Sequence, residues 1–376
     1  MLKSRPSALR RFYRKARRLY KMVLYGRPSG MISIREFDGN IGSWHRVRIA
    51  EGLRNPRPKT LGKAPMDFTS MLDPIPELGV ISLRHGNVFG SQGWVFTEDK
   101  RFVYDISWYG LHAHLGLLPS EFPKPQRIDG RCLVLASDWG NVNYAHFILD
   151  CLPRLYLYQE AGYSIADVDY ICIPEPPSRS ARRTMIALGI PEDKCVWSND
   201  NALLQFDEII ATSFPGSRRN YAQWVPRYLQ TILKPVGVLG APVARKIYVP
   251  RSGERKIINE EQLLNIARNY DIEPHDFSNI DNQPEIFNEC ELVIGPHGAG
   301  LTNIAFCKRN TKVLELIPSD HRFPYYYTIA QAGELDYYCL VGNSLGKRPD
   351  DSFGPSPYDF CVAPDEFETS LQQMVT

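Results

Sequence analysis

Residues 293–306 read VIGPHGAGLTNIAF. The apolar run ELVIG at 291–295 predicts a buried parallel strand, and GLTNIAF at 300–306 predicts the first turns of a helix. Small residues in the connecting turn allow backbone N–H groups to approach a ligand, and free amides at a helix start favour an anion. Ligands of open parallel sheets bind at the carboxyl ends of strands.

We therefore predict an anion site in this turn, although the spacing is neither that of a P-loop nor GxGxxG. The alternative is a tight strand-to-helix turn that binds nothing. The residues expected to line the site are His297, Gly298, Ala299, Gly300, Thr302 and Asn303.

Two arginines and one acid accompany the turn. Arg251 ends the predicted strand KIYVPR and Arg255 follows four residues later, so both are expected at the same sheet edge. Guanidinium groups match phosphate geometry, although either arginine could instead be a solvated loop residue. Glu315 lies within the apolar strand KVLELIP, where a carboxylate needs a partner. We expect the partner of this carboxylate to be either a pair of ribose hydroxyls or a basic side chain in an internal salt bridge.

Strand and helix patterns alternate through most of the chain. The stretch 79–106 predicts short antiparallel strands, whereas 131–212 and 245–318 each predict an alternating strand–helix series. Such series predict an α/β protein with two Rossmann-like domains facing a cleft. The expected divisions are a basic helix at 1–30, a first domain at 31–235, a second domain at 236–345 and a tail with a helix at 346–376, the Pro/Gly-rich stretch 234–245 being the linker.

The first domain carries its own polar group in the run NYAHFILDCLPRL. In a helix starting near Asn143, the side chains of His146, Asp150 and Arg154 fall at steps of four on one face. A histidine and a carboxylate in this arrangement can deprotonate a hydroxyl group. The alternative is a core histidine bonded to its helix partner. Pro153 is expected to kink or shorten the helix.

Composition is that of a soluble globular protein, with 43% hydrophobic and 23% charged residues among 376. The eight cysteines show no CxxC pair, which favours reduced core thiols over a secreted disulfide framework. Residues 1–30 hold ten Lys or Arg and no acid, which leaves 34 basic and 42 acidic residues in the remainder.

The basic segment also has an apolar stripe at three- and four-residue steps. We expect an amphipathic helix on an anionic membrane surface, at the inner face of the cell membrane in the cytoplasm. A solvated arm or a nucleic-acid contact is the alternative, but no other pattern supports nucleic acid as a partner. The stripe consists of Leu9, Phe12, Tyr13, Ala16, Leu19, Tyr20, Val23 and Leu24.

Four blocks in order, NYAHFILDCLPRLYLY, RKIINEEQL, GPHGAGLTNIAF and VLELIP, resemble the signature blocks of glycosyltransferase family 61. The resemblance covers about residues 130–340. It implies a GT-B-like architecture and an inverting transfer that needs no metal and no cofactor. The implied partners are a nucleotide-sugar donor, UDP-linked by expectation, and a glycan or lipid-linked acceptor. Bacterial members of the family are associated with capsular and exopolysaccharide synthesis, so surface polysaccharide synthesis is the expected setting.

The resemblance also assigns residues. His297, Gly298, Ala299, Gly300 and Thr302 match the diphosphate site, and Arg255, Asn259 and Glu260 match a block beside the nucleotide. Asn143, His146, Asp150 and Arg154 belong to the acceptor-side helix, with His146 or Asp150 as the general base. The spacing of Arg251 and Arg255 is shorter than in many relatives, which leaves the role of Arg251 open.

Three other interpretations compete. A metal-dependent transferase needs a motif such as DVD at 167–169, but this one precedes a strand, so we interpret it as a surface turn. His112 and His114 lack a third metal ligand. A catalytically silent sugar- or nucleotide-binding module, or a membrane-associated scaffold acting through residues 1–30, are the alternatives outside the enzymes.

Overall fold

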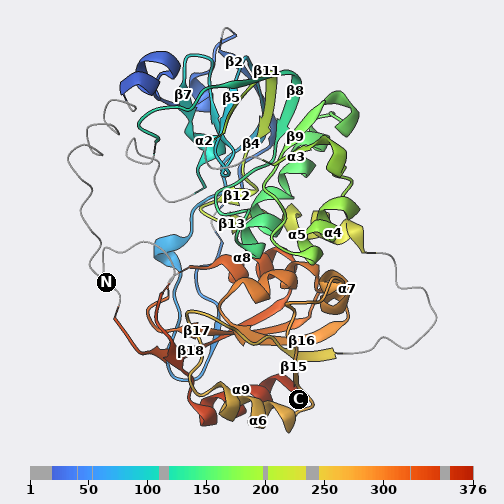
Figure 1. Ribbon diagram of the computed structural model, residues 1–376. Coiled ribbons are helices and arrows are strands. Elements are labelled where there is room, and N and C mark those ends of the chain that lie inside the picture. The colour runs from blue at the N-terminus through green and yellow to red at the C-terminus, as the bar shows by residue number, and fades with distance from the viewer. Residues whose placement is uncertain are drawn as a thin grey trace.

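The computed structural model describes residues 19–39, 41–52, 54–109, 118–197, 202–233, 245–321, 323–347 and 356–375. Within these residues the chain forms two lobes, one above the other in Figure 1, each built on its own sheet. The first lobe is built on the sheet that contains β8, and the second on the sheet that contains β16. The prediction of an α/β protein is therefore confirmed.

The sheet of the first lobe is mixed. Its order is β1-β7-β6-β5-β11-β8-β9-β10, and β4 joins β11 and pairs in turn with β2. Strands β8 to β11 run parallel, whereas β4, β5 and β6 pair antiparallel, as the alternating stretch 79–106 predicted. The strands are β1 (Gly30–Ile32), β2 (Gly42–Arg48), β4 (Leu78–Arg84), β5 (Asn87–Phe89), β6 (Trp94–Phe96), β7 (Arg101–Val103), β8 (Gln126–Val134), β9 (Tyr170–Cys172), β10 (Cys195–Val196) and β11 (Leu203–Thr212).

The sheet of the second lobe is parallel apart from its last strand. Its order is β15-β14-β16-β17-β18-β19, and β18 also pairs with β3. The strands are β14 (Arg245–Tyr248), β15 (Glu273–Pro274), β16 (Cys290–Pro296), β17 (Lys312–Pro318), β18 (Asp336–Ser344), β19 (Phe360–Cys361) and β3 (Lys59–Leu61).

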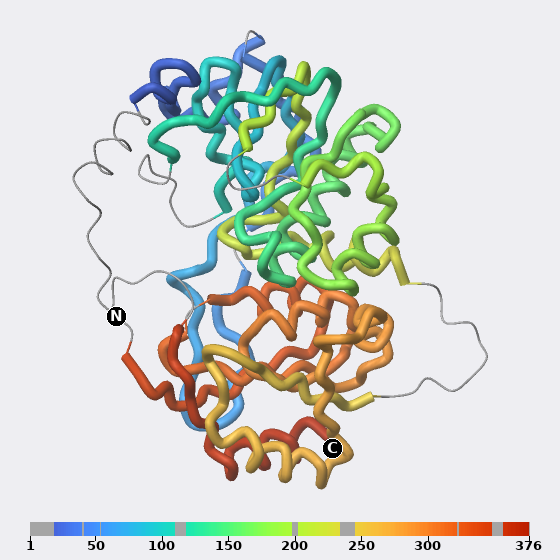
Figure 2. The backbone as a smooth tube through the Cα atoms, in the orientation of Figure 1, coloured from blue at the N-terminus to red at the C-terminus, as the bar shows by residue number. Residues whose placement is uncertain are grey.

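Strand β3 departs from the division predicted between the domains. It lies within 31–235, yet it pairs in parallel with β18, and Figure 2 shows this part of the chain running down beside the second lobe. Strand β19 and helix α9 (Pro364–Val375), expected in a separate tail, also belong to the second lobe. A short apolar segment can pair with the open edge of either sheet, and its local sequence does not specify which sheet it joins.

Helices lie between the two sheets and outside them (Figure 1). The α-helices are α2 (Tyr104–Ser107), α3 (Arg154–Glu160), α4 (Arg179–Ala187), α5 (Trp224–Leu229), α6 (Glu260–Arg268), α7 (Gln283–Asn288), α8 (Tyr325–Ala332) and α9. The 3₁₀ helices are η1 (Ile34–Glu36), η2 (Thr69–Met71), η5 (Ile165–Asp167), η6 (Glu192–Lys194), η7 (Gln230–Ile232) and η8 (Ala299–Phe306), and η4 (His146–Cys151) is a π-helix.

One hydrophobic core is shared by both lobes. Alternation along the strands sends Leu133 and Val293 into this common core, while Cys132 and Ile294 point to separate cores on the outer faces. Helices α3, α4 and α5 meet α7, α8 and η8 in the common core, whereas α6 and α9 cover the far face of the second sheet. The two lobes are therefore packed against each other by apolar burial.

The N-terminal segment is described only in part. Residues 19–25 are helical, while 1–18, which form most of the predicted basic helix, lie outside the described residues, as does most of the predicted linker. Leu19, Tyr20, Val23 and Leu24 are all exposed. Within the described chain, none of the helices has the length and apolarity required to span a bilayer.

Candidate functional site

The second lobe gathers basic side chains at the carboxyl ends of its parallel strands. Arg251 and Arg255 follow β14, and His297 follows β16. Strands β14, β16 and β17 are neighbours, so the loops after them meet at one edge. The predicted juxtaposition of the two arginines with the GPHGAG turn is thus found in the structure.

Gly298 is explained by the close approach of Arg251. A Cβ atom at this position would lie 1.7 Å from Nη1 of Arg251. Its φ of 172° is extended backbone that any residue adopts, so the glycine is required for space and not for a sharp turn. A Cβ atom at Gly300 would likewise lie only 2.7 Å from Cγ1 of Val249. Arg251, whose role was left open, therefore lies directly over the turn.

The segment after the turn differs from the prediction. Residues 299–306 form the 3₁₀ helix η8 and not an α-helix, so the expected anion site at an α-helical N-terminus is not formed. Asn303 is buried; its Oδ1 accepts from the Tyr144 hydroxyl at 2.7 Å and its Nδ2 donates to Gln283 at 2.7 Å. Both ends of its amide hold the protein together, which corrects its assignment to the ligand. Thr302 is also buried, and within the described chain its hydroxyl has no hydrogen-bond partner.

Positive charge accumulates here, and the charges of Glu254 and Asp359 offset it only in part. Neither Arg251 nor Arg255 forms an ion pair within the described residues; Arg251 Nε donates to the Glu254 carbonyl at 2.6 Å and Arg255 Nη1 to the Ser356 carbonyl at 3.0 Å. Burial, and then the charge of Arg255, lowers the pKa of Arg251, and burial lowers that of Arg255. Two half-buried guanidinium groups that repel each other form a site that favours an anion.

His297 is oriented by two buried groups. Its Nδ1 lies 2.5 Å from Glu315 Oε1, and the Tyr337 hydroxyl donates to Glu315 Oε2 at 2.5 Å. Burial raises the pKa of Glu315 to about 8, while burial and the charges of Arg255 and Arg251 lower the pKa of His297 well below its ordinary value. At neutral pH a protonated Glu315 donates to Nδ1 of a neutral imidazole, which leaves Nε2–H as a donor. Glu315 thus has an internal partner on each carboxyl oxygen.

Asn259 and Glu260 support the site from behind. Asn259 exchanges hydrogen bonds with the backbone of Val362, at 2.8 and 3.2 Å. Glu260 accepts from the Tyr248 hydroxyl at 2.9 Å, and burial raises its pKa while the backbone of Arg251 lowers it. Glu260 is therefore next to the loop that carries Arg251, while Asn259 attaches the C-terminal segment to α6.

The first lobe places His146 and Asp150 in contact. His146 Nδ1 lies 2.8 Å from Asp150 Oδ2, and the Tyr221 hydroxyl donates to Oδ1 at 2.7 Å. Both residues lie on the π-helix η4, which precedes Pro153, a residue that cannot donate a helical hydrogen bond. Within the described chain no hydrogen bond involves His146 Nε2, and 17% of the side chain is exposed.

Arg219 completes this cluster and was not predicted. It is buried; its Nε lies 3.0 Å from Asp150 Oδ2 and its Nη2 donates to Asp138. Burial alone would raise the pKa of Asp150, but the charge of Arg219 and hydrogen bonds from His146 and Tyr221 hold it below its ordinary value. Asp150 is therefore an ionised acceptor with its lone pairs occupied. This state suits a residue that orients His146 better than it suits a base.

The backbone that carries Arg219 is strained. Strands β12 (Gly216–Ser217) and β13 (Asn220–Tyr221) form a hairpin whose two central residues, Arg218 and Arg219, have φ of 48° and 60°. Such turns favour Asn-Gly, so an Arg-Arg pair is costly here. Ion pairs with Asp73, Asp138 and Asp150 hold the hairpin. A two-residue turn between short polar runs gave no sequence signal that this arginine would be buried.

Arg154 and Asn143 have structural roles. The wide turn of η4 brings Arg154 into the core, fully buried, where it donates to the carbonyls of Ala136, Ile106 and Thr212. This corrects its assignment to the acceptor side. Asn143 Oδ1 accepts from the Ala145 N–H at 2.9 Å and so caps the start of the helical segment.

Tyr325, the first residue of α8, connects the two clusters. Its ring lies 6.2 Å from the His297 ring, and the charges of Arg219, Asp150 and Asp138 act on its hydroxyl. Burial raises the pKa of Tyr325 to about 12, so the phenol is neutral. A single half-buried tyrosine therefore lies near both the basic site of the second lobe and the histidine–aspartate cluster of the first.

Comparison with known families agrees with this arrangement. A family model described as glycosyltransferase 61 matches residues 144–314, which include both His146 and His297. This part of the chain thus matches the glycosyltransferase 61 family. Beta-1,2-xylosyltransferase RCN11 of Oryza sativa subsp. japonica is 39% identical over 62 residues, which cover 16% of this chain and 12% of that protein. The aligned part is thus a small fraction of the length of this relative.

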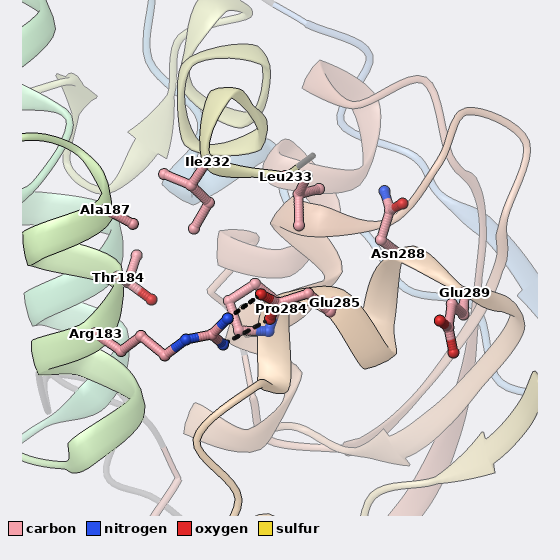
Figure 3. A pocket seen from close by; sticks show the side chains of 9 residues that line it. All are labelled: Arg183, Thr184, Ala187, Ile232, Leu233, Pro284, Glu285, Asn288 and Glu289. Atoms are coloured by element: carbon pink, nitrogen blue, oxygen red, sulfur yellow. Dashed lines mark hydrogen bonds and ion pairs between the residues drawn. The ribbon is translucent and has the colours of Figure 1, made fainter. Parts of the chain in front are cut away.

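A separate pocket of about 350 Å³ lies between the lobes. Figure 3 shows α4 on one side, Ile232 and Leu233 above, and the Arg183–Glu285 ion pair across the opening. Its charged groups are already paired, and it includes neither cluster. Among the described residues no group of three His, Cys, Asp or Glu has the arrangement of a metal site, and His112 and His114 lie outside them.

The Glu315–His297 pair predicts a pH dependence of stability. The pKa of Glu315 is raised from 4.5 to about 8, so the folded state retains a proton that the unfolded state releases, and the free energy of unfolding falls as pH rises to about 8. The lowered pKa of His297 opposes this only below its ordinary value of 6.5. Between these two values we expect Glu315→Gln to flatten a slope of up to about 1.4 kcal/mol per pH unit.

Urea unfolding at a series of pH values measures this slope. The amide still donates to His297 and accepts from Tyr337, which keeps the contacts. Exposed Glu98→Gln is the matched control and should leave the slope unchanged. Equal slopes in Glu315→Gln and the parent protein would contradict the protonation state assigned to Glu315.

Proposed function

We propose that the protein is an inverting glycosyltransferase that moves a sugar from a nucleotide-sugar to a hydroxyl group of a glycan or glycolipid. The observation that carries this proposal is a pair of clusters that both lie near Tyr325: two arginines that bond only to carbonyls among the contacts of the described residues, and a histidine held by a buried aspartate. The family match over residues 144–314 supports the same chemistry. We interpret the two lobes as a GT-B-like pair.

The basic site suits a departing nucleoside diphosphate. As the bond between the anomeric carbon and the phosphate oxygen breaks, negative charge develops on that oxygen. Arg251, Arg255 and the Nε2–H of His297 are positioned to stabilise it, and the positive charge of the two arginines fulfils the role that a divalent ion has in other transferases. The proposed transfer therefore has no metal requirement and no cofactor.

His146 suits the role of general base. Asp150 accepts Nδ1–H, which leaves the lone pair of Nε2 to take the proton of the acceptor hydroxyl as its oxygen attacks the anomeric carbon. The new bond forms opposite the departing diphosphate, so the configuration inverts in one displacement. The resulting imidazolium is stabilised by ionised Asp150.

Nucleotide binding is the first test. We expect UDP to raise the unfolding temperature without magnesium in a panel of UDP, GDP, CDP and CMP, since a ligand at 100 times its Kd adds about 2.7 kcal/mol. Arg251→Met should weaken UDP binding about tenfold, the loss of one charge-assisted contact. Arg309→Met, which removes a surface arginine of the same lobe paired with Glu334, is the control. The absence of any nucleotide-dependent shift would refute the proposal.

A second test addresses the role of His146. We expect His146→Ala to slow sugar transfer by about 10² to 10⁴ while UDP binding stays unchanged, because general bases contribute in this range. Transfer is followed as UDP release from UDP-glucose, UDP-N-acetylglucosamine and UDP-xylose, the last chosen because the rice relative is named a xylosyltransferase. Methyl glycosides serve as acceptors. UDP binding without transfer in the parent protein would instead support a silent binding module.

We also propose that residues 1–30 bind an anionic membrane at the inner face of the cell membrane, where a lipid-linked acceptor for surface polysaccharide would be found. The apolar side chains exposed on the described helical residues support this, with Val23 at 75% and Leu24 at 52%.

Vesicle sedimentation tests the membrane proposal. The full chain should sediment with vesicles that contain phosphatidylglycerol and not with pure phosphatidylcholine. Val23→Glu with Leu24→Glu should reduce the bound fraction severalfold, whereas Ile186→Ala, an exposed apolar change on α4, should not. Equal sedimentation of the double variant and the parent would contradict the proposal.

A further inference from the structure

Trp139 stands at the edge of the first-lobe cluster with its side chain exposed. The residue is 44% exposed, which is unusual for tryptophan, and it follows the parallel strand β8 at the carboxyl edge of the sheet. Its ring centre lies 5.7 Å from that of His146. An indole is thus next to the histidine proposed to deprotonate the acceptor.

Other side chains fix the indole in place. The Arg219 guanidinium lies 5.3 Å from the ring centre, and the Trp108 ring lies 5.9 Å away. Arg219 also pairs with Asp138 and Asp150, so its own position is set by buried charges. The remaining surface of the indole is in contact with solvent, and this surface is rigidly presented.

The backbone of Trp139 is strained in a way that packing does not explain. Its φ is 60°, in the left-handed region that side chains other than glycine rarely adopt. Three hydrogen bonds maintain it: the N–H donates to Gln92 Oε1 at 2.9 Å, and the carbonyl accepts from Val142 and Asn143 at 3.2 and 3.0 Å. This strained backbone holds the ring at the surface beside His146, and the ring is not part of a hydrophobic core.

We propose that Trp139 is the stacking platform for the acceptor, and that the acceptor group is therefore a pyranose ring. The C–H face of a pyranose is apolar and matches an exposed indole, while its hydroxyl groups extend from the ring edge towards Nε2 of His146. An acceptor without such a face, such as a serine hydroxyl or a simple lipid alcohol, would gain nothing from the indole. This inference rests on the proposed function and specifies the acceptor class for the same site.

Saturation-transfer NMR with UDP bound tests the proposal. The probes are the methyl glycosides of β-D-glucose, β-D-galactose, α-D-mannose and β-D-xylose. We expect at least one to bind the parent protein, Trp139→Ala to weaken its binding about three- to tenfold, and Trp139→Phe to retain most of it because a smaller aromatic face remains. Ile186→Ala, a loss of exposed apolar surface elsewhere, is the control.

The outcomes separate this inference from the proposed function. UDP binding by Trp139→Ala, measured in the same samples, should equal that of the parent and also shows that the variant is folded. Intact UDP binding with no glycoside bound by the parent, or with equal glycoside binding by the parent and Trp139→Ala, would overturn the platform alone. Loss of UDP binding in the parent would reject the proposed function itself.

Discussion

The buried ion network around Arg219 is the constraint on which the candidate site depends. One guanidinium lies between Asp138 and Asp150, close to Tyr325 of the other lobe. Burial alone would lower the pKa of Arg219, but the two carboxylates raise it well above its ordinary value. Removing one partner of such a network leaves a buried charge unpaired, which costs about 3–5 kcal/mol. The ion pairs of Arg219 with Asp138 and Asp150 therefore also hold the strained hairpin that carries Arg219.

The two lobes use charge in opposite ways. In the first lobe, Arg219 is neutralised by two carboxylates, so the network is complete without a ligand. In the second lobe, Arg251 and Arg255 have carbonyl partners only, and their charges and burial depress the pKa of His297. The first arrangement fixes a reactive group, and the second favours a bound anion. Tyr325 lies near both, and we propose that they are parts of one site.

Contacts between the lobes hold these parts in register. Apolar burial in the shared core brings the facing helices together, and directional bonds then fix their position. The Tyr144 hydroxyl donates to Asn303 in the other lobe, and Arg183 pairs with Glu285. Asn303 thus connects the lobes, although a polar residue just after a glycine turn is typical of a ligand site. Sequence position alone could not distinguish these two uses.

The sequence by itself determined the strand–helix alternation, the strands at 291–296 and 312–318, and the contact between His146 and Asp150. These features follow from local periodicity and from steps of four residues along one helical segment. Only the tertiary structure decided that β3 joins the second sheet, that Arg154 enters the core and that Arg219 completes the cluster. Each of these depends on partners more than 50 residues away, Thr212 for Arg154 at a separation of 58 and Asp150 for Arg219 at 69. The free energy of burying a charge depends on those distant partners, so the local sequence pattern could not predict that these arginines are buried.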